Sequence, residues 1–478
     1  MEFPFNNNEH GLWQYLLAVA GGILVFFAVA RLMSEKRQPS NTVAWLLAIV
    51  LIPWFGVPLY LLLGGRKLRR LAGRKSIFSP VLPGTAPFAL AATSSPAAHI
   101  ISAAGACPPL ADNSIRFLTE GQDAYTALEN QIRSATSSIH ITTFILARDD
   151  TGRRIIRLLA DRARAGVKVR LLLDAVGCLI SSHGFCDPLR DAGGEVRRFM
   201  PVFPFFSTRS SANLRNHRKI AVFDQRHAIV GGHNIAREYM GPGHFRRRWR
   251  DFGAEIHGPA AALLNEVFLA DWAFASGVPV EKLREPLPPP SLHPAGSSAL
   301  QVVASGPDIV GDPLYEAILS LIQEAERSIW IVTPYFIPDE VLLRSLIVKA
   351  RAGREVVLIV PAHSNHPVTD FARKHYLREL QAAGAHVRLF GPGMLHSKAM
   401  IVDDRYGLLG SANFDLRSLF VNFEIGVMVY SESDAQAMKQ WALQLLSRCQ
   451  APAAGRSRRA RMFGNVAEEL SRLLAPLL

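Results

Sequence analysis

The 478-residue sequence predicts an α/β protein made of two sandwich halves related by pseudo-two-fold symmetry, preceded by an N-terminal transmembrane helical hairpin. Three observations predict this fold class. A short motif occurs twice, a helix pattern that runs into an apolar strand recurs around each copy, and two long apolar runs lie near the N-terminus. Helices that alternate with apolar strands are typical of α/β layers with a mixed or largely parallel sheet.

The apolar runs predict how the chain meets a membrane. Residues 11–32 are apolar up to Arg31, which is about the length that spans a bilayer. The second run, residues 44–63, contains prolines and a glycine, and it either spans with a kink or dips in and returns. The basic residues between 66 and 75 outweigh the connector, so we expect Ser76 onward to be cytoplasmic. A pair of buried core helices is the alternative interpretation of these runs.

Composition narrows the class of partner. Lys and Arg number 53 against 40 Asp and Glu, a formal net charge of +13. This balance favours an anionic partner, either nucleic acid or an anionic lipid surface. The four cysteines have no metal-ligand spacing and form no C-x-x-C pair, so they predict neither a metal site nor a redox motif.

Internal repetition divides the rest of the chain. Residues 125–146 match residues 315–336 as a helix pattern that leads into an apolar strand. We expect a membrane-anchoring hairpin with a basic juxtamembrane segment over 1–75, a linker over 76–114 and the first half over 115–285. A Pro-rich linker over 286–297 and the second half over 298–478, which ends in a tail helix, complete the predicted organisation.

The repeated motif reads H-x-K-x-x-x-x-D. Its two copies supply the candidate catalytic residues His217, Lys219, Asp224, His396, Lys398 and Asp403. The apolar residues after each histidine predict a buried strand, on which the histidine and lysine share a face. Each aspartate stands at an odd offset, which indicates a structural role at the strand end.

The chemistry of these residue types suits phosphoryl transfer. An imidazole is a reasonable nucleophile toward phosphorus and a reasonable proton donor near neutral pH. Asn234 and Asn413 follow the two histidines at the same distance, and with the lysines they are candidates to bind phosphate oxygens. Buried structural histidines and surface lysines are the alternative, but a second copy with the same spacing argues against it.

The halves differ before the motif. Residues 200–216 form a longer connection than residues 391–395, and they hold Phe203, Phe205 and Phe206. This segment is either a packed loop or an apolar lip that admits acyl chains.

The twin motif resembles that of the phospholipase D superfamily, and flanking stretches resemble the bacterial cardiolipin synthases. The stretches are NLRNHRKIAVFD (213–224), GGHNIAREYMG (231–241), HSKAMIVDD (396–404) and GSANFDLRSLFVNFE (410–424). The resemblance covers nearly the whole chain and implies two phospholipase D-like halves with one shared site. His233 is a departure, because a smaller or less basic residue is expected there.

The resemblance also implies roles for further residues. In this superfamily an acid supports each histidine through the far ring nitrogen; Glu424 stands in that place for the second half and Asp251 for the first. A helix cap or surface salt bridge is the alternative for Asp251. The N-terminal histidine is usually the nucleophile, which assigns that role to His217 and general acid–base catalysis to His396.

The implied activity is phosphatidyl transfer from one phosphatidylglycerol to another, which yields cardiolipin and glycerol through a phosphatidyl-histidine. The implied partners are these anionic phospholipids and the bilayer of a bacterial inner membrane, in which the chain would be multi-pass. No metal, cofactor or nucleic acid is expected, and an oligomer is possible. A phospholipase D hydrolase, a transphosphatidylase on other phospholipids, a nuclease and a non-enzymatic membrane scaffold remain the alternatives.

Overall fold

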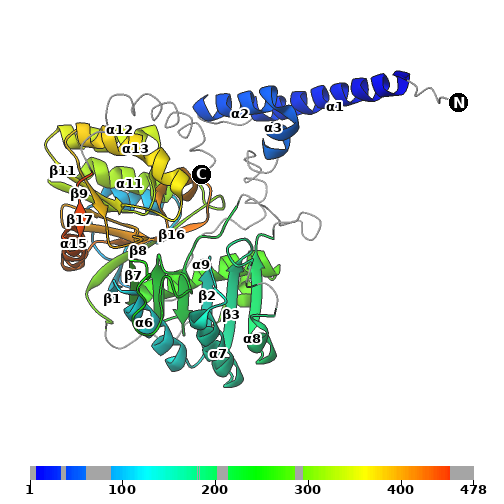
Figure 1. The fold of residues 1–478 in the computed structure, drawn as a ribbon. Helices are drawn as coiled ribbons and strands as arrows, with labels where there is room; N and C mark the ends of the chain where they lie inside the picture. The colour runs from blue at the N-terminus through cyan, green and yellow to red at the C-terminus, as the bar shows by residue number, and fades with distance from the viewer. Residues whose placement is uncertain are drawn as a thin grey trace. The chain divides into compact units, whose positions relative to one another are not determined.

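The computed structural model describes residues 7–33, 39–60, 88–179, 181, 184–201, 214–285 and 294–452 (Figure 1). The chain divides into two compact units, an N-terminal one and a large one that holds both halves of the repeat. Several predicted features lie outside the described residues: the basic segment after residue 65, the phenylalanines of the 200–216 connection, most of the Pro-rich linker and the tail helix.

The N-terminal unit consists of α1 (Asn7–Met33), α2 (Pro39–Leu51) and α3 (Pro53–Leu59). The second apolar run is broken at Pro53, between α2 and α3, which fits both a kinked span and a segment that dips in and returns. Gly56 allows α3 to approach α2, because a Cβ there would lie 2.0 Å from the carbonyl oxygen of Ala48. In the part of the chain that the structure describes, no helix has the length and apolarity needed to cross a membrane.

The large unit is built on one mixed sheet of 15 strands. The first half contributes β1 (Leu110–Leu118), β2 (Ser138–Thr143), β3 (Lys168–Asp174), β4 (Glu195–Phe199), β5 (Ile220–Phe223), β6 (His227–Gly231) and β7 (Gly253–His257). The second half contributes β8 (Ser298–Ser305), β9 (Ser328–Val332), β11 (Glu355–Pro361), β12 (His386–Phe390), β13 (Ala399–Val402), β14 (Tyr406–Gly410), β16 (Glu424–Val429) and β17 (Cys449–Gln450). A separate short parallel pair is formed by β10 (Phe336–Ile337) and β15 (Phe414–Asp415).

The strand order confirms the predicted two halves. From the central pair β8 and β1, the order runs outward as β7-β6-β5-β2-β3-β4 on one side and β16-β14-β13-β9-β11-β12-β17 on the other. In each half three strands are parallel and the next three antiparallel, and β5 and β13 occupy equivalent positions. The pseudo-two-fold axis therefore passes between β1 and β8.

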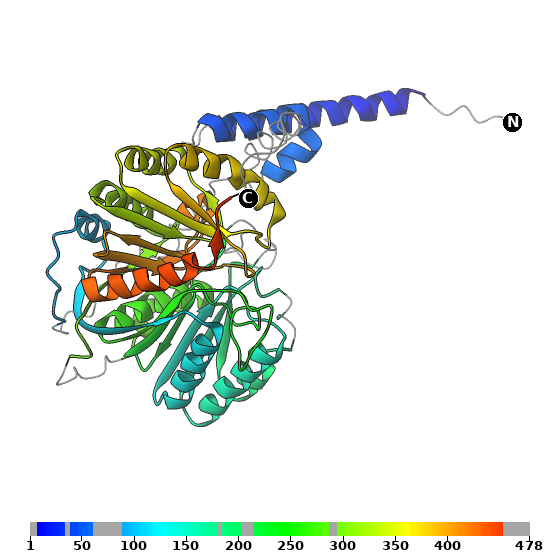
Figure 2. The ribbon, with the colours of Figure 1, turned by 60° about the vertical axis from the view of Figure 1, so that its left-hand side comes forward.

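Helices cover both faces of the sheet (Figures 1 and 2). The first half has α6 (Gly121–Ser134), α7 (Asp150–Arg164), α8 (Asp187–Asp191), α9 (Pro259–Ser276) and α10 (Val280–Leu283). The second has α11 (Pro313–Glu324), α12 (Glu340–Arg351), α13 (Pro367–Ala382), α14 (Leu416–Phe420) and α15 (Glu432–Leu446). On one face α9 and α15 pack on a core that runs through both halves, whereas α6 and α7 enclose a core of the first half on the opposite face.

The predicted linker over residues 76–114 needs correction. Its described part contains α5 (Pro96–Ala103) and the first residues of β1, a central strand. The side chain of Gln301 donates to the carbonyl oxygen of Ala98, and Ser95 donates to Glu324, so α5 belongs to the folded unit. The polar residues of β1 (LADNSIRFL) do not give the apolar pattern that predicts a strand. It forms a strand because it is hydrogen-bonded to the two neighbouring strands, β7 and β8.

Candidate active site

Each motif lies at the entrance to an interior strand. His217 and Lys219 directly precede β5, and His396 and Lys398 directly precede β13. The prediction of a buried strand is right for the apolar residues that follow, but the histidines and lysines stand just before it. Because β5 and β13 are equivalent strands of one sheet, the fold presents the two motifs from opposite sides of the pseudo-two-fold axis.

Short backbone bridges join the motif of one half to the other half. The amide of His217 donates to the carbonyl oxygen of Phe423 at 2.9 Å, and that of Phe423 donates to Arg215 at 3.0 Å. In the same way His396 donates to Arg250 at 2.6 Å, and Arg250 donates to Met394 at 2.8 Å. The backbone of each histidine is therefore hydrogen-bonded to the residue just before the acid of the other half, which is Phe423 before Glu424 and Arg250 before Asp251.

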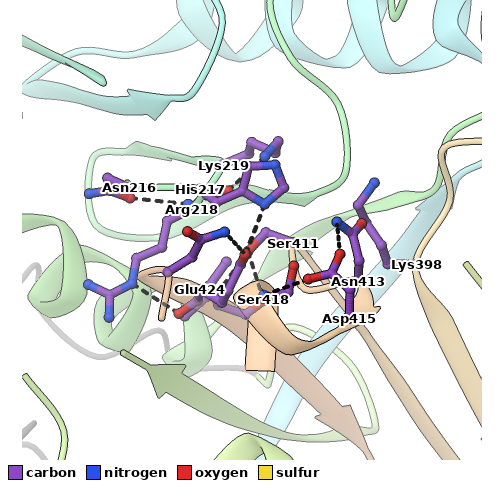
Figure 3. A network of polar contacts seen from close by, with 12 residues as sticks. Asn216, His217, Arg218, Lys219, Lys398, Ser411, Asn413, Asp415, Ser418 and Glu424 are labelled. Atoms are coloured by element: carbon purple, nitrogen blue, oxygen red, sulfur yellow. Dashed lines mark hydrogen bonds and ion pairs between the residues drawn. The ribbon is translucent and has the colours of Figure 1, made fainter. Parts of the chain in front are cut away.

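These bridges set the partners of the two imidazoles. Nδ1 of His217 lies 3.0 Å from Oε1 of Glu424, and Nδ1 of His396 lies 2.6 Å from Oδ2 of Asp251 (Figure 3 shows the first pair). We expected Glu424 to serve the second half and Asp251 the first. The structure corrects this pairing: each acid contacts the histidine of the opposite half, because the backbone bridges run between halves. Asp251 is thus neither a helix cap nor a surface ion pair.

The two acids are held differently. Glu424 is fully buried and accepts from the hydroxyl of Ser411, which Figure 3 shows beside it. Asp251 accepts from the backbone amide of Phe252 at 2.8 Å, and burial raises the pKa of its carboxyl group. Gly232 packs against Asp251 at the position where the second half has Ser411. Only glycine fits there, because a Cβ would lie 2.0 Å from Oδ1 of Asp251.

Burial favours the neutral form of both imidazoles. Desolvation lowers the pKa of His217, while the Glu424 carboxylate opposes that shift. Desolvation also lowers the pKa of His396 well below its ordinary value, and the charges of Lys398 and Lys219 add to this effect. A neutral ring whose Nδ1–H is donated to a carboxylate leaves Nε2 as the reactive nitrogen.

The lysines show that the motifs share one site. Burial lowers the pKa of Lys219 to about 7 and that of Lys398 to about 8. Each ammonium acts on the titration of the histidine in the opposite half, so all four groups lie close together. Lys219 donates to the carbonyl oxygen of His217 at 2.7 Å, and Lys398 donates to that of His396. Nζ of Lys398 also lies 2.8 Å from Nδ1 and 3.1 Å from Nε2 of His396.

The candidate amides occupy equivalent buried places. Oδ1 of Asn234 accepts from the backbone amide of Ile145 at 3.1 Å. Nδ2 of Asn413 donates to Asp415 at 3.0 Å, and Figure 3 shows Asn413 beside Lys398. Their binding of substrate phosphate remains a prediction.

The motif aspartates lie outside the cluster. Asp224 accepts from the backbone amides of residues 136, 137 and 138, and Asp403 accepts from those of residues 326, 327 and 328. Both have a positive φ, 50° and 54°, at the turn after their strand. They fasten the chain that enters β2 and β9, which agrees with the structural role that their odd offsets indicate and not with a place among reacting groups.

Aromatic side chains complete the walls of the site, and the sequence pattern did not single them out. Phe144 meets the ring of His217 edge-on at 5.0 Å between centroids. Tyr239 and Trp249 lie 5.0 and 5.5 Å from the ring of His396. For Tyr239 and Trp249 the one sequence signal is proximity to Asn234 and Asp251, which does not distinguish a wall of the site from ordinary core packing, and Phe144 carries no such signal. Within the described residues, no group of three or more His, Cys, Asp or Glu could hold a metal ion.

Similarity to a solved structure defines the class of fold. The phosphatidylserine synthase of Haemophilus influenzae Rd KW20 aligns with a TM-score of 0.56 over 76% of this chain and 95% of its own, at 17% identity. At this identity the likeness shows the fold alone, an α/β fold on a mixed sheet.

Sequence comparison identifies the family within that class. The family model described as cardiolipin synthase, PLD-like domain, matches residues 128–272 and 318–446, and a phospholipase D-nuclease N-terminal model matches 23–65. The cardiolipin synthase of Geobacillus sp. (strain WCH70) is 32% identical over 100% of this chain and 97% of its own length. That of Listeria welshimeri is 30% identical over 98% of this chain and 100% of its own. The chain belongs to the cardiolipin synthases of the phospholipase D superfamily and is a phospholipid phosphatidyltransferase.

Proposed function

We propose that the chain transfers the phosphatidyl group of one phosphatidylglycerol to a second, giving cardiolipin and glycerol, with His217 as nucleophile and His396 as acid and base. The observation that carries this proposal is the crossed pair of His–carboxylate contacts, His217 with Glu424 and His396 with Asp251. Each contact occupies Nδ1 and makes Nε2 the reactive nitrogen for chemistry on a shared phosphate; in His396 this Nε2 lies 3.1 Å from Nζ of Lys398, a candidate to bind the same phosphate.

The reaction then takes two displacements. In the first, Nε2 of His217 attacks phosphorus, and the bond from phosphorus to the headgroup glycerol oxygen breaks. His396, which the negative charge of the bound phosphodiester converts to the imidazolium, donates its Nε2 proton to that oxygen. In the second, His396 takes the proton of a hydroxyl on the acceptor phosphatidylglycerol, whose oxygen attacks phosphorus and releases His217. One phosphodiester replaces another, so the balance requires no nucleotide.

Lys219, Lys398 and the two asparagines would bind the phosphate oxygens. A phosphodiester brings negative charge to lysines whose pKa values are about 7 and about 8 in the unliganded site. That charge favours the ammonium form, which supplies charge-assisted hydrogen bonds as the transition state develops. This assembly needs no metal, and the expected absence of one remains a prediction.

A product assay tests the transfer. Membranes that contain the chain are incubated with phosphatidylglycerol labelled in the headgroup glycerol, and the lipids and free glycerol are identified. Cardiolipin and labelled glycerol in equal amounts are expected. Phosphatidic acid as the main product would instead show that water is the acceptor and that the hydrolase alternative is correct.

The N-terminal unit supports a membrane location. Large apolar side chains are exposed along its helices: Tyr15, Leu16, Val19, Ile23, Leu24, Phe26, Phe27, Met33, Leu47, Val50, Leu51, Ile52, Trp54 and Phe55. A surface of this kind needs a bilayer or a partner to cover it. We propose a multi-pass anchor in the bacterial inner membrane with the catalytic halves cytoplasmic. Reporter fusions after residue 478 test this, since activity of a periplasmic reporter there would contradict the topology.

A further inference from the structure

The middle residue of the first motif, Arg218, is the centre of a buried polar network that links the two halves. Its guanidinium is 1% exposed and makes three hydrogen bonds. It donates to Asp271 at 2.6 Å, to the carbonyl oxygen of Ser305 at 3.0 Å and to that of Glu424 at 3.0 Å. Asp271 lies on α9 of the first half, whereas Ser305 and Glu424 belong to strands of the second.

Asn216 joins the same network from the other side of His217. Its side chain donates to Asp271 at 2.9 Å, and its Oδ1 accepts from the backbone amide of Arg218 at 3.1 Å, a contact drawn in Figure 3. The residues before and after His217 are therefore both fastened to one carboxylate. Since Arg218 also holds the backbone of Glu424, the histidine and its acid are tied to a common frame.

The second half lacks this device. The residue equivalent to Arg218 is Ser397, whose hydroxyl reaches the carbonyl oxygen of Arg250 at 3.3 Å. Its neighbour equivalent to Asn216 is Leu395, which is fully buried and apolar. A charged brace across the half interface thus supports one His–carboxylate pair and not the other.

We propose that Arg218, with Asp271 as its counter-charge, is a positioning residue that sets the Glu424–His217 contact across the two halves. Arg218 touches neither ring nitrogen, and it acts by fixing the backbone of the acid relative to the backbone of the nucleophile. The inference rests on the proposed role of His217. A displacement of about 1 Å in such a contact is enough to slow a reaction about 100-fold.

The test separates positioning from simple stability. Arg218→Met alone leaves Asp271 buried without its cation, and such a variant can fail to fold. The double variant Arg218→Met with Asp271→Leu is made in an Asp308→Asn background, because Oδ1 of Asp308 also lies 3.7 Å from the guanidinium, and it removes the cation and both buried carboxylates that face it. Neutral replacement of buried charges often keeps the fold. The melting temperature and secondary structure of this variant are compared with wild type. Arg170→Met is the matched control, because Arg170 is 4% exposed and bonds Glu195 and the carbonyl oxygen of Leu283 in the first half.

The readout is the first turnover of nitrophenol release from a phospholipid with that leaving group, by the full chain in lipid–detergent micelles. Its limiting rate and half-saturating lipid concentration are written kcat and KM for this test. We expect the folded double variant to lose about 10- to 100-fold in kcat with little change in KM. The Glu424 carboxylate raises the pKa of His217, so a looser contact should lower that pKa. Because the attacking ring must be neutral, the acidic limb of the rate profile should move to lower pH.

Two results would overturn the proposal. One is a folded double variant with wild-type kcat, and the other is a reduced kcat whose acidic limb stays in place, as a merely structural role predicts. Arg170→Met should leave both quantities per folded molecule unchanged. Nitrophenol release in the first turnover precedes the acceptor step, so this outcome is independent of whether the wild type makes cardiolipin, which the product assay decides.

Discussion

The two halves share one backbone plan and differ in the polar groups around their histidines. In the first, His217 meets Glu424, which accepts from Ser411 and lies in the Arg218 network. In the second, His396 meets Asp251, which packs against Gly232, and both ring nitrogens of His396 lie near the ammonium of Lys398. A duplicated fold can therefore supply two imidazoles with different environments, which a reaction with one nucleophile and one proton carrier needs.

The largest expected effect separates the histidines. His217→Ala should form no covalent phosphatidyl-enzyme, whereas His396→Ala should still form one from a nitrophenyl phospholipid, since that leaving group needs no proton. Both should lose turnover of phosphatidylglycerol by about 10⁴-fold or more. Mass spectrometry of the trapped protein checks this, and a phosphohistidine at position 396 in the wild type would reverse the assignment.

Exchange of the acids for amides tests the crossed pairing. Glu424→Gln should act on the first-half histidine and slow covalent attack, while Asp251→Asn should act on the second and slow proton transfer. A loss of about 10²- to 10⁴-fold is expected for each, because the imidazole loses its orienting acceptor. Single-turnover kinetics with nitrophenyl and natural leaving groups distinguish them: Asp251→Asn should retain the burst with nitrophenol. A burst lost in Asp251→Asn and kept in Glu424→Gln would contradict the pairing.

For Lys219 we predict that removal of the charge stabilises the fold but slows the reaction. Burial lowers the pKa of Lys219 from 10.5 to about 7, so the unfolded chain binds more protons between these values. The buried Lys219 therefore lowers the stability of the fold by its full amount below about pH 7, and this loss disappears as the pH rises toward 10.5. For Lys398 the same change occurs between about pH 8 and 10.5. Lys219→Met should raise the melting temperature at pH 7 by a few degrees, lose about 100-fold in kcat and weaken the pH dependence of stability. An unchanged pH dependence in thermal melts would count against this.

The motif aspartates should have the smallest effect on catalysis. Asp224→Ala and Asp403→Ala each remove the acceptor of three backbone amides, at a cost of about 1–3 kcal/mol of stability. Burial raises the pKa of Asp224, but the hydrogen bonds from the amides of residues 136–138 outweigh this effect, so the net pKa is below the ordinary value of 3.8. The stability that ionised Asp224 contributes is therefore present above pH 3.8 and is lost as the pH falls below that value. Denaturant unfolding should show the loss, with kcat per folded molecule near wild type. A kcat reduced as far as in the lysine variants would place these aspartates in the reaction.

Local pattern was sufficient for most of the candidate site. The repeated H-x-K spacing singled out the histidines and lysines that the structure gathers at one place. The apolar residues after each motif predicted β5 and β13. The same reasoning missed β1, whose neighbours rather than its own hydropathy make it a strand. It also assigned the acids to the wrong halves, because hydrogen bonds such as that between His217 and Phe423 join residues that are distant in sequence.

The sequence by itself was enough to identify the repeat, the candidate histidines and lysines, and the structural role of the motif aspartates. These features could be predicted because periodicity and spacing along one strand are local properties. Only the tertiary structure decided which carboxylate meets which imidazole, that Phe144, Tyr239 and Trp249 wall the site, and that Arg218 carries a brace absent from the second half. The physical reason is that these features depend on the contact between two separately encoded halves. Burial at that contact makes the charge of each imidazole depend on a carboxylate from the other half.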